Sequence, residues 1–489
     1  MSGNPLETGS VLISAEKLSK MVHVAGLSGL AEYLNTSEAA LRLLISILLG
    51  FPIALFHRYI LYGKNAALQH TLFVLCGVAI GCWNYGINMY HSASALFGSY
   101  LIFMVFGSTS RMVLMNFLFN MIYLLYGYYT TSTEDYDIKW TMPHCVLTLR
   151  LIGLGFNIWD GQRDDEKLSE YQKQIALKKR PSFLEVAAFT YFPGSFLVGP
   201  QFSMRRYLDF VNCRLINDDK KQARELPDCL QPGLKRALLG VLYIILFQIG
   251  TSLLPDQYLL SKEFNNLNLI YRMFLVGIWG HVSLYKYISC WLLTEGVCTN
   301  FGLTYNGKSK DGQIQWDGCA NVKLTTFENA IRFNDYILSF NTNTNHWCAE
   351  YIYKRLKFMG SKVLSQFFTL MFLAVWHGFH TGYYHCFMME FLVMFTERNA
   401  LSYLEKKEYL LGLLKNHSIL RFLFWVVLKV YTYLFLGYCL VPFFFLSFHR
   451  YHKVFLSVYY YGHVIFLIYP AITIIRMIVS PRKSKKRTE

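Results

Sequence analysis

Long apolar runs alternate with short polar segments along almost the whole chain. A membrane-spanning helix needs about 20 mainly apolar residues, and two of the runs are long enough to tilt or to hold two half-helices. The pattern predicts an all-α polytopic integral membrane protein with about ten or eleven membrane segments. The candidate runs cover residues 39–62, 66–86, 91–107, 110–130, 140–158, 183–200, 234–254, 266–294, 361–382, 383–397, 419–447 and 453–479.

The runs form one series, without a visible repeat or a second domain. We therefore expect a single domain over residues 1–489, with residues 1–38 as an N-terminal interfacial segment and residues 480–489 as a basic tail. Residues 1–24 lack the continuous apolar core of a cleaved signal peptide. The run 39–62 is accordingly predicted to act as an internal signal-anchor.

Three longer polar stretches interrupt the series. Residues 159–182 form a charged connector with room for an interfacial helix, and residues 203–236 are predicted to be an exposed loop. Residues 305–360 are the longest polar stretch, and their segment 328–340 (ENAIRFNDYILSF) has the spacing of an amphipathic helix.

Composition supports a membrane protein over a soluble one. Hydrophobic residues make up 54% of the 489 positions and charged residues only 16%, too few to coat a soluble protein of this size. The net charge of +16 is carried by short loops between apolar runs, a distribution that argues against nucleic acid. It fits a face that attracts anionic lipid headgroups and an anionic cofactor.

The tail ends Lys486-Arg487-Thr488-Glu489, close to the dilysine pattern that retrieval coats read as an endoplasmic-reticulum address. The alternative is a plain basic flank after the last span. Both interpretations place the C-terminus in the cytosol. We favour retrieval, and hence the endoplasmic reticulum membrane.

Candidate chemistry lies in the apolar run that contains His377, His380, His385 and Glu390. Ionisable side chains inside a spanning segment are costly and usually face a cavity or a partner. For His385 and Glu390, a hydrogen bond to a buried backbone group explains the residue equally well. A continuous helix would place His377 and His380 one turn apart on the same face. No HExxH motif or zinc-ligand spacing occurs, so we expect no metal site.

A second unusual motif precedes this run. Residues 340–347 read FNTNTNHW, three Asn alternating with Thr, which is turn-like by propensity. The basic and aromatic segment 351–357 (YIYKRLK) follows directly.

Trp376-His377-Gly378, with the Asn-rich motif upstream, resembles the membrane-bound O-acyltransferase (MBOAT) family. His377 matches the buried histidine of that family and Asn341 its polar partner. Further similar segments are 191–200 (YFPGSFLVGP), 286–296 (KYISCWLLTEG) and 316–318 (WDG), the last two typical of the lysophospholipid branch.

The resemblance implies an MBOAT-type helical fold around a buried catalytic chamber. It implies an acyl-CoA-dependent enzyme that re-acylates the sn-2 hydroxyl of lysophosphatidylcholine and related lysophospholipids, with polyunsaturated acyl donors. His377 would be the general base. Asn341 would orient the hydroxyl or the imidazole, or stabilise the oxyanion. No nucleophilic Ser or Cys motif is evident, so we predict direct transfer without an acyl-enzyme.

Substrate contacts are expected around these two motifs. Trp376 and nearby rings would line an acyl tunnel, and cations would meet the phosphates of acyl-CoA, which acts as a co-substrate and not as a bound cofactor. Snorkelling of the basic side chains is an equally good explanation for each cation singly. The candidate contacts are Asn343, Trp376, His380, Lys354, Arg355 and Tyr351, together with Lys357, Arg205 and Arg206.

Other functions remain open at this stage. Another MBOAT acyltransferase would act on a sterol, a diacylglycerol or a peptide. A non-enzymatic membrane transporter would also bury polar residues, although its usual sign is a repeated pair of halves. Expected partners are the two substrates, the lipid bilayer and a retrieval coat. The oligomeric state is undetermined, with a homodimer as one arrangement.

Overall fold

The computed structural model describes residues 27–34, 36–134, 137–216 and 228–479. Within these ranges the chain is helical, and its only β pairings are the isolated bridges Lys308–Ile314 and Val322–Phe340. The predicted all-α class is confirmed. The tail 480–489 and most of the proposed interfacial segment 1–38 lie outside the described residues, so both stay predictions.

Six helices form the N-terminal part, and their boundaries follow from local capping. Ser37, Asn65 and Thr109 each accept a backbone N–H at the start of a helix. Gly86 and Gly107, both at positive φ, lie directly after Tyr85 and Phe106, where two of the helices end. The helices are α2 (Leu27–Tyr33), α3 (Glu38–Phe56, extended by the π-turn His57–Leu61), α4 (Ala66–Tyr85), α5 (Tyr90–Phe106), α6 (Ser110–Thr131) and α7 (Thr141–Asp160).

The middle of the chain begins with short helices and ends with long ones. The elements are α8 (Glu170–Ile175), α9 (Phe183–Thr190), α10 (Met204–Val211), α11 (Leu230–Leu253), α12 (Asp256–Leu259), α13 (Lys262–Asn265), α14 (Leu269–Ser283) and α15 (Tyr285–Phe301). Helix α8, with a capping box at Ser169, lies in the connector where a helix was expected.

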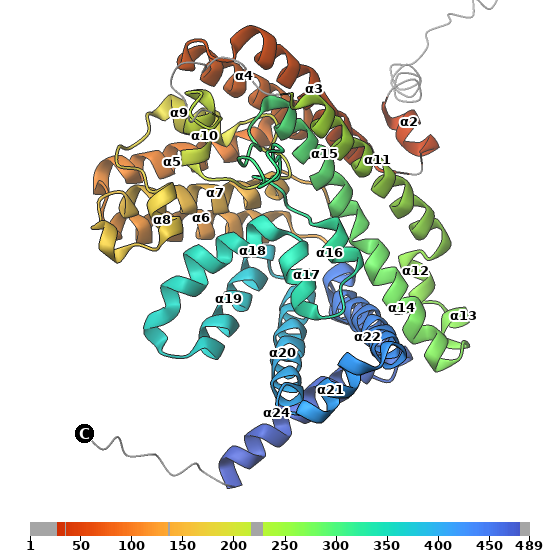
Figure 1. Cartoon of the computed structure of the whole chain (residues 1–489). Helices are drawn as coiled ribbons and strands as arrows, with labels where there is room; N and C mark the ends of the chain where they lie inside the picture. Colours follow the sequence, from red (N-terminus) through yellow and green to blue (C-terminus); the bar gives the residue numbers. More distant parts are fainter. Residues whose placement is uncertain (1–26, 35, 135–136, 217–227, 480–489) are drawn as a thin grey trace, which may run out of the picture.

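The C-terminal part begins with α16 (Leu324–Glu328), α17 (Phe333–Ser339) and α18 (Thr342–Cys348), followed by π and 3₁₀ turns to Met359. It continues with α19 (Lys362–His377), α20 (Thr381–Leu404), α21 (Glu408–Asn416), α22 (Ser418–Phe445), α23 (Phe448–Ser457) and α24 (Tyr461–Val479). Figure 1 shows α3–α10 on one side of the molecule, α20–α24 on another, and α16–α18 between them.

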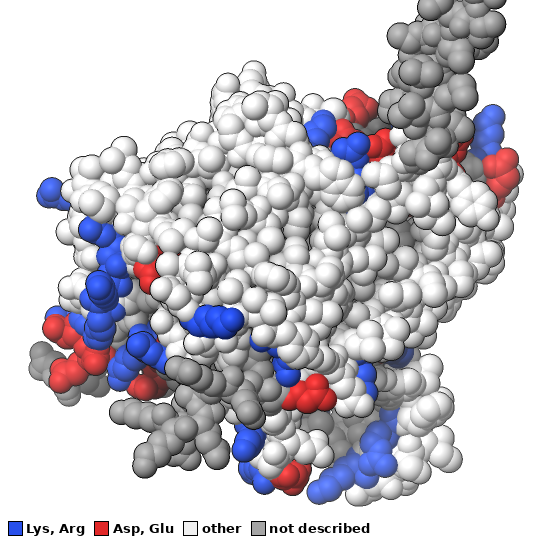
Figure 2. Space-filling view, turned by 90° about the horizontal axis from the view of Figure 1, so that it is seen from above, with Lys and Arg blue, Asp and Glu red and all other residues white. Residues whose placement is uncertain are grey.

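Five helical segments are long and apolar enough to cross a membrane by length and composition, among the residues that the structure describes. The total of ten or eleven membrane segments stays a prediction. Figure 2 shows a wide surface with few charged residues, on which most Lys, Arg, Asp and Glu lie along the left and lower edges and at the upper right. A surface with so few charges suits contact with lipid. The five segments are Glu38–Leu61, Ala66–Phe106, Ser110–Thr131, Leu230–Leu259 and Ser418–Phe445.

Several apolar runs are not the continuous helices that the sequence predicted. The run 183–200 is wrong as a span, because α9 ends at Thr190 and the chain is irregular up to Ser203. The run 266–294 divides at Leu284 into α14 and α15, the two half-helices that its length allowed. The run 453–479 lies in two helices, α23 and α24, instead of one. In the latter, Tyr459 and Tyr460 adopt positive φ between the two helices.

The predicted amphipathic helix at 328–340 is also wrong as one element. Helix α16 ends at Glu328, and α17 begins only at Phe333. The Asp335 carboxylate accepts the backbone N–H groups of Ile331 and Arg332 at 3.1 Å, and this cap fixes the start of α17.

Close helix packing depends on small residues. A Cβ atom at Gly277 of α14 would lie 3.0 Å from the carbonyl oxygen of Tyr433 in α22. Gly280 and Gly437 meet backbone to backbone at the same contact. Glycines at such positions let two helices approach more closely than larger side chains allow, as is common in membrane proteins.

Candidate active site

His377 is the last residue of α19, where the helix stops at the wall of an internal chamber. Gly378 follows at φ 122, a conformation that favours glycine, and its N–H bonds to the Val375 carbonyl at 3.1 Å. The imidazole lies among aromatic rings, with centroid distances of 5.2 Å to Tyr383, 5.4 Å to Phe387 and 5.1 Å to Phe443. These contacts hold the ring at the chamber.

The expectation that His377 and His380 share a helix face is wrong. The chain breaks at Gly378, and His380 is the extended residue directly before α20. Both side chains nevertheless line the chamber. His377 and His380 therefore reach the same chamber from the two sides of a turn between α19 and α20, and not from one face of a single helix.

Asn341 lies in a left-handed conformation, with φ 49 and ψ 42, directly before α18. Asn tolerates this region better than most residues do. The turn expected for the Asn-rich motif is thus present at Asn341. From Thr342 onward the prediction of a turn is wrong, because the motif continues as helix α18.

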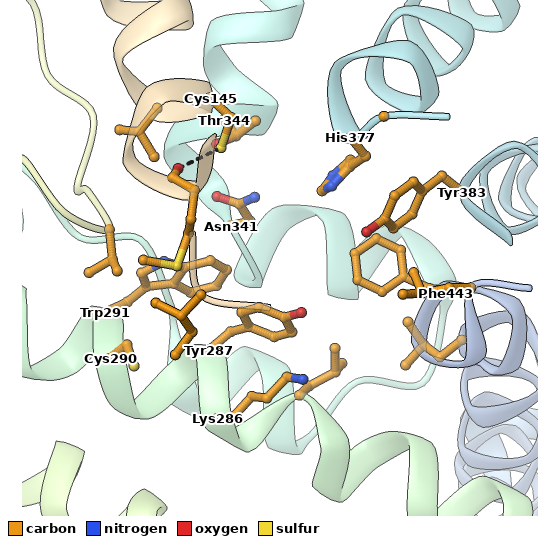
Figure 3. A pocket seen from close by; sticks show the side chains of 18 of the residues that line it. Cys145, Lys286, Tyr287, Cys290, Trp291, Asn341, Thr344, His377, Tyr383 and Phe443 are labelled. Atoms are coloured by element: carbon orange, nitrogen blue, oxygen red, sulfur yellow. Dashed lines mark hydrogen bonds between the residues drawn. The ribbon is translucent and has the colours of Figure 1, made fainter. Parts of the chain in front are cut away.

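The chamber has a volume of about 700 Å³ and is lined by both His377 and Asn341. This size is typical of a site for a drug-sized or larger ligand. Figure 3 shows the two side chains approaching from different elements, with Tyr287, Trp291, Tyr383 and Phe443 around the space between them. A mostly apolar wall with a few converging polar groups suits a long-chain lipid substrate.

Of the predicted substrate contacts, Trp376 and His380 line this chamber. The Trp376 indole donates to the Cys145 carbonyl at 3.0 Å, which fixes the ring in the wall. Asn343, Tyr351, Lys354 and Arg355 are not among the described residues that line it. Their part in binding stays a prediction.

These four side chains have structural partners instead. Asn343 Nδ2 donates to the Cys319 carbonyl at 3.1 Å, and the Tyr351 hydroxyl donates to Asn157 Oδ1 at 2.7 Å. Lys354 pairs with Glu350, and Arg355 pairs with the buried carboxylate of Asp160.

The other cations predicted to contact the phosphates of acyl-CoA are Arg206, Arg205 and Lys357, and two of them are paired within the protein. Arg206 donates to the carbonyls of Leu303 and Tyr305 at 2.9 and 2.8 Å, so it holds the loop after α15. Arg205 pairs with Asp209 at 3.0 Å. Lys357 is exposed to solvent, as Arg205 is.

Lys286 is a chamber residue that the sequence analysis did not single out. It lies at the start of α15, and its ammonium group is 5.0 Å from the centre of the Tyr287 ring and 4.8 Å from that of Phe444. The signal was present, since a lysine inside the apolar run 266–294 is as costly as a buried histidine.

Polar side chains from the connection between α6 and α7 line one part of the chamber. Lys139 pairs with Asp137 at 2.9 Å, and the Thr133 hydroxyl donates to the same carboxylate at 2.8 Å. The hydrogen bonds from Lys139 and Thr133 lower the pKa of Asp137 below its ordinary value. Asp137 is therefore an anion at neutral pH and keeps Lys139 engaged.

Within the described residues, no group of three or more His, Cys, Asp or Glu side chains converges as a metal ion requires. The chemistry that the chamber can perform from its own residues is acid–base chemistry. His377 can take or give a proton, and Asn341 can donate or accept a hydrogen bond.

A helical membrane protein whose apolar chamber is lined by a histidine and an asparagine has the features expected of an enzyme that acts on a lipid. The profile of the membrane-bound O-acyltransferase family matches residues 125–448, which include both side chains, and the chain belongs to this family. It is therefore a multi-pass membrane acyltransferase.

Individual relatives match almost end to end. The chain is 43% identical to lysophospholipid acyltransferase 5 of Homo sapiens, over 98% of each protein. It is 42% identical to lysophospholipid acyltransferase 5 of Drosophila melanogaster, over 94% of this chain and 91% of that one. The protein of the same name in Caenorhabditis elegans is 34% identical, over 94% and 96%.

Proposed function

We propose that this protein is an acyl-CoA-dependent lysophospholipid acyltransferase that re-acylates the sn-2 hydroxyl of lysophosphatidylcholine and related lipids, with polyunsaturated acyl donors, and so remodels membrane phospholipids. The observation that carries the proposal is the apolar chamber with His377 and Asn341 in its wall. Similarity over nearly the full length to proteins named lysophospholipid acyltransferase 5 supports the acceptor class.

The reaction needs a base, an acyl donor and a site free of competing water. The neutral imidazole of His377 takes the proton of the sn-2 hydroxyl as that oxygen attacks the thioester carbonyl. The new ester C–O bond forms, the C–S bond breaks, and the CoA thiolate leaves with the proton returned by the imidazolium. The apolar wall excludes the water that would hydrolyse the thioester. Transfer is direct, without an acyl-enzyme.

Lys286 favours a phospholipid over a neutral acceptor such as a sterol or diacylglycerol. The ammonium group of Lys286 lies in the wall of a mostly apolar chamber, where a positive charge attracts an anionic ligand. A lysophospholipid brings a phosphodiester that an ammonium group can bind, whereas a sterol or a diacylglycerol brings no anion. We assign Lys286 to this phosphate.

The proposal is tested by transfer to a panel of lysophospholipids and to an uncharged monoacylglycerol. Wild-type protein is expected to prefer the phosphate-bearing acceptors. Lys286→Met should raise KM for lysophospholipids about tenfold or more, the value of one charge-assisted hydrogen bond. The KM for acyl-CoA should not change, which distinguishes the acceptor phosphate from those of CoA. A wild-type preference for monoacylglycerol would contradict the proposal, and Lys286→Arg is the matched control that keeps the charge.

The cellular site follows from the same proposal. The basic C-terminal segment supports a cytosolic tail and retrieval to the endoplasmic reticulum membrane. Fluorescence microscopy of the tagged protein and protease protection of the tail test these assignments, and a lumenal tail would contradict them.

A further inference from the structure

The side chain of Asn341 is hydrogen-bonded to a second asparagine, Asn321. Asn321 Nδ2 donates to Asn341 Oδ1 at 3.3 Å. The backbone pairs as well, since the N–H of Thr342 donates to the Asn321 carbonyl at 3.0 Å and Val322 bridges Phe340. The segment around Asn321 therefore lies alongside the turn that carries Asn341.

Asn321 is fixed in turn by an ion pair between two long helices. Glu295 of α15 accepts the Asn321 backbone N–H at 2.6 Å, and its other oxygen accepts from Arg236 of α11 at 2.6 Å. Arg236 also donates to the Val322 carbonyl at 2.8 Å. Glu295 is 2% and Asn321 4% exposed, so the carboxylate and the amide are shielded from solvent, whereas Arg236 is half-buried. Each group in this network has a hydrogen-bond partner that fixes its orientation.

Donor and acceptor chemistry sets the orientation of both amides. The backbone N–H of Asn343 donates to Asn321 at 3.0 Å, and a backbone N–H cannot accept, so Asn321 must present its oxygen there. Its NH₂ group is then the end that faces Asn341. Because an NH₂ group only donates, the atom of Asn341 that accepts this hydrogen bond must be its side-chain carbonyl oxygen.

The orientation of Asn341 follows from this sequence of partners. With its oxygen turned toward Asn321, its NH₂ group is the end left for the chamber. In the view of Figure 3 this nitrogen points toward the side where His377 lies. The side chain therefore offers the chamber a hydrogen-bond donor and not an acceptor.

We propose that Asn321, backed by Glu295 and Arg236, is a positioning residue that turns the amide of Asn341 so that its NH₂ group faces the reacting atoms. This inference rests on the proposed function, in which Asn341 acts in acyl transfer. It selects among the roles open to Asn341: the side chain donates a hydrogen bond, to the thioester oxygen or to the oxygen of the acceptor hydroxyl, and does not accept one from that hydroxyl.

Asn321→Asp tests the orientation with a small change of shape. The aspartate keeps an oxygen for the Asn343 N–H but has no donor for Asn341 Oδ1, so the Asn341 amide is expected to turn over. The expected result is a large fall in kcat. Its upper limit is about hundredfold, the typical effect of removing one well-placed hydrogen-bond donor. The KM values for both substrates should stay within about twofold. Asn321→Ala, which adds no charge, should show a smaller loss of the same kind.

A double-mutant cycle separates positioning from a general structural role. In the Asn341→Ala background, Asn321→Asp should cost almost nothing further, because the two residues act through one group. Multiplicative losses, or an unchanged kcat in Asn321→Asp, would overturn the inference. If the activity of Asn341→Ala alone is too low to measure, the single variants Asn321→Asp and Asn321→Ala test the inference. A lowered kcat with unchanged KM values supports positioning, and any other pattern contradicts it.

Thr342→Val is the matched control. It removes the hydrogen bond from the Thr342 hydroxyl to the Ala320 carbonyl, 2.8 Å long, from the same pair of segments without touching either amide. Its kcat should stay near that of wild type, and thermal melting should show a comparable small loss of stability. Full activity of Asn341→Ala would refute the proposed function itself, whereas loss in Asn341→Ala with full activity in Asn321→Asp and Asn321→Ala would refute only this inference.

Discussion

His377→Ala is expected to abolish acyl transfer while the protein still folds and reaches the membrane. Without the imidazole, the acceptor hydroxyl loses the base that takes its proton, and loss of such a group typically costs about 10²- to 10⁴-fold in rate. The end of α19 is anchored by other groups, the Trp376 indole on the Cys145 carbonyl and the turn at Gly378. The measurement is the initial rate of phospholipid formation by purified protein, beside its melting temperature.

His385→Gln is the matched control for this prediction. His385 belongs to the same sequence run, but its Nε2 pairs with His463 Nε2 at 2.7 Å and it is not among the described residues that line the chamber. We expect this variant to keep most of the wild-type rate. Equal losses in both variants would mean that a buried histidine matters here for packing and not for chemistry.

Arg355→Ala is expected to destabilise the protein more than it weakens acyl-CoA binding. The Asp160 carboxylate is 0% exposed and accepts from Arg355 at 3.2 and 2.5 Å. Removing one partner of a buried pair typically costs about 3–5 kcal/mol. Arg163 also contacts Asp160, at 3.3 Å, so the lower end of that range applies. Thermal melting and the yield of folded protein measure the effect.

Two further variants make this result specific. Asp160→Asn in the Arg355→Ala background should recover part of the lost stability, because it removes the uncompensated charge. Lys362→Ala, at an exposed lysine of α19, should change neither stability nor activity. A raised KM for acyl-CoA with unchanged melting of Arg355→Ala would instead show that Arg355 contacts the phosphates of CoA.

The helical class could be predicted because a lipid-exposed backbone leaves few alternatives to the helix. The irregular segment 191–203 could not, because apolar composition does not distinguish a helix from a loop buried in protein. Its carbonyls find a partner far away in sequence, since Arg150 of α7 donates to the carbonyl of Pro200 at 3.3 Å and to that of Ser195 at 3.5 Å. No local pattern reports such a contact.

In the site, too, residues in an unusual local sequence could be predicted, and residues that matter through contacts distant in sequence could not. His377 and Asn341 stand out in the sequence because each is a polar residue in an unusual setting, and the structure places both in one chamber. The local sequence around Asn321 and Glu295 did not single out either residue. Their relation to Asn341 depends on how α11, α15 and the segment after α15 pack together, which composition and spacing do not encode.

The central claim is that His377 drives acyl transfer to the sn-2 hydroxyl of a lysophospholipid. The most direct test mixes purified protein with labelled polyunsaturated acyl-CoA and lysophosphatidylcholine, with a sterol and a diacylglycerol as competing acceptors. The label should appear at the sn-2 position of phosphatidylcholine, where phospholipase A2 releases it, in wild-type protein and not in His377→Ala. Label on the sterol or diacylglycerol instead, or equal transfer by His377→Ala, would contradict the claim.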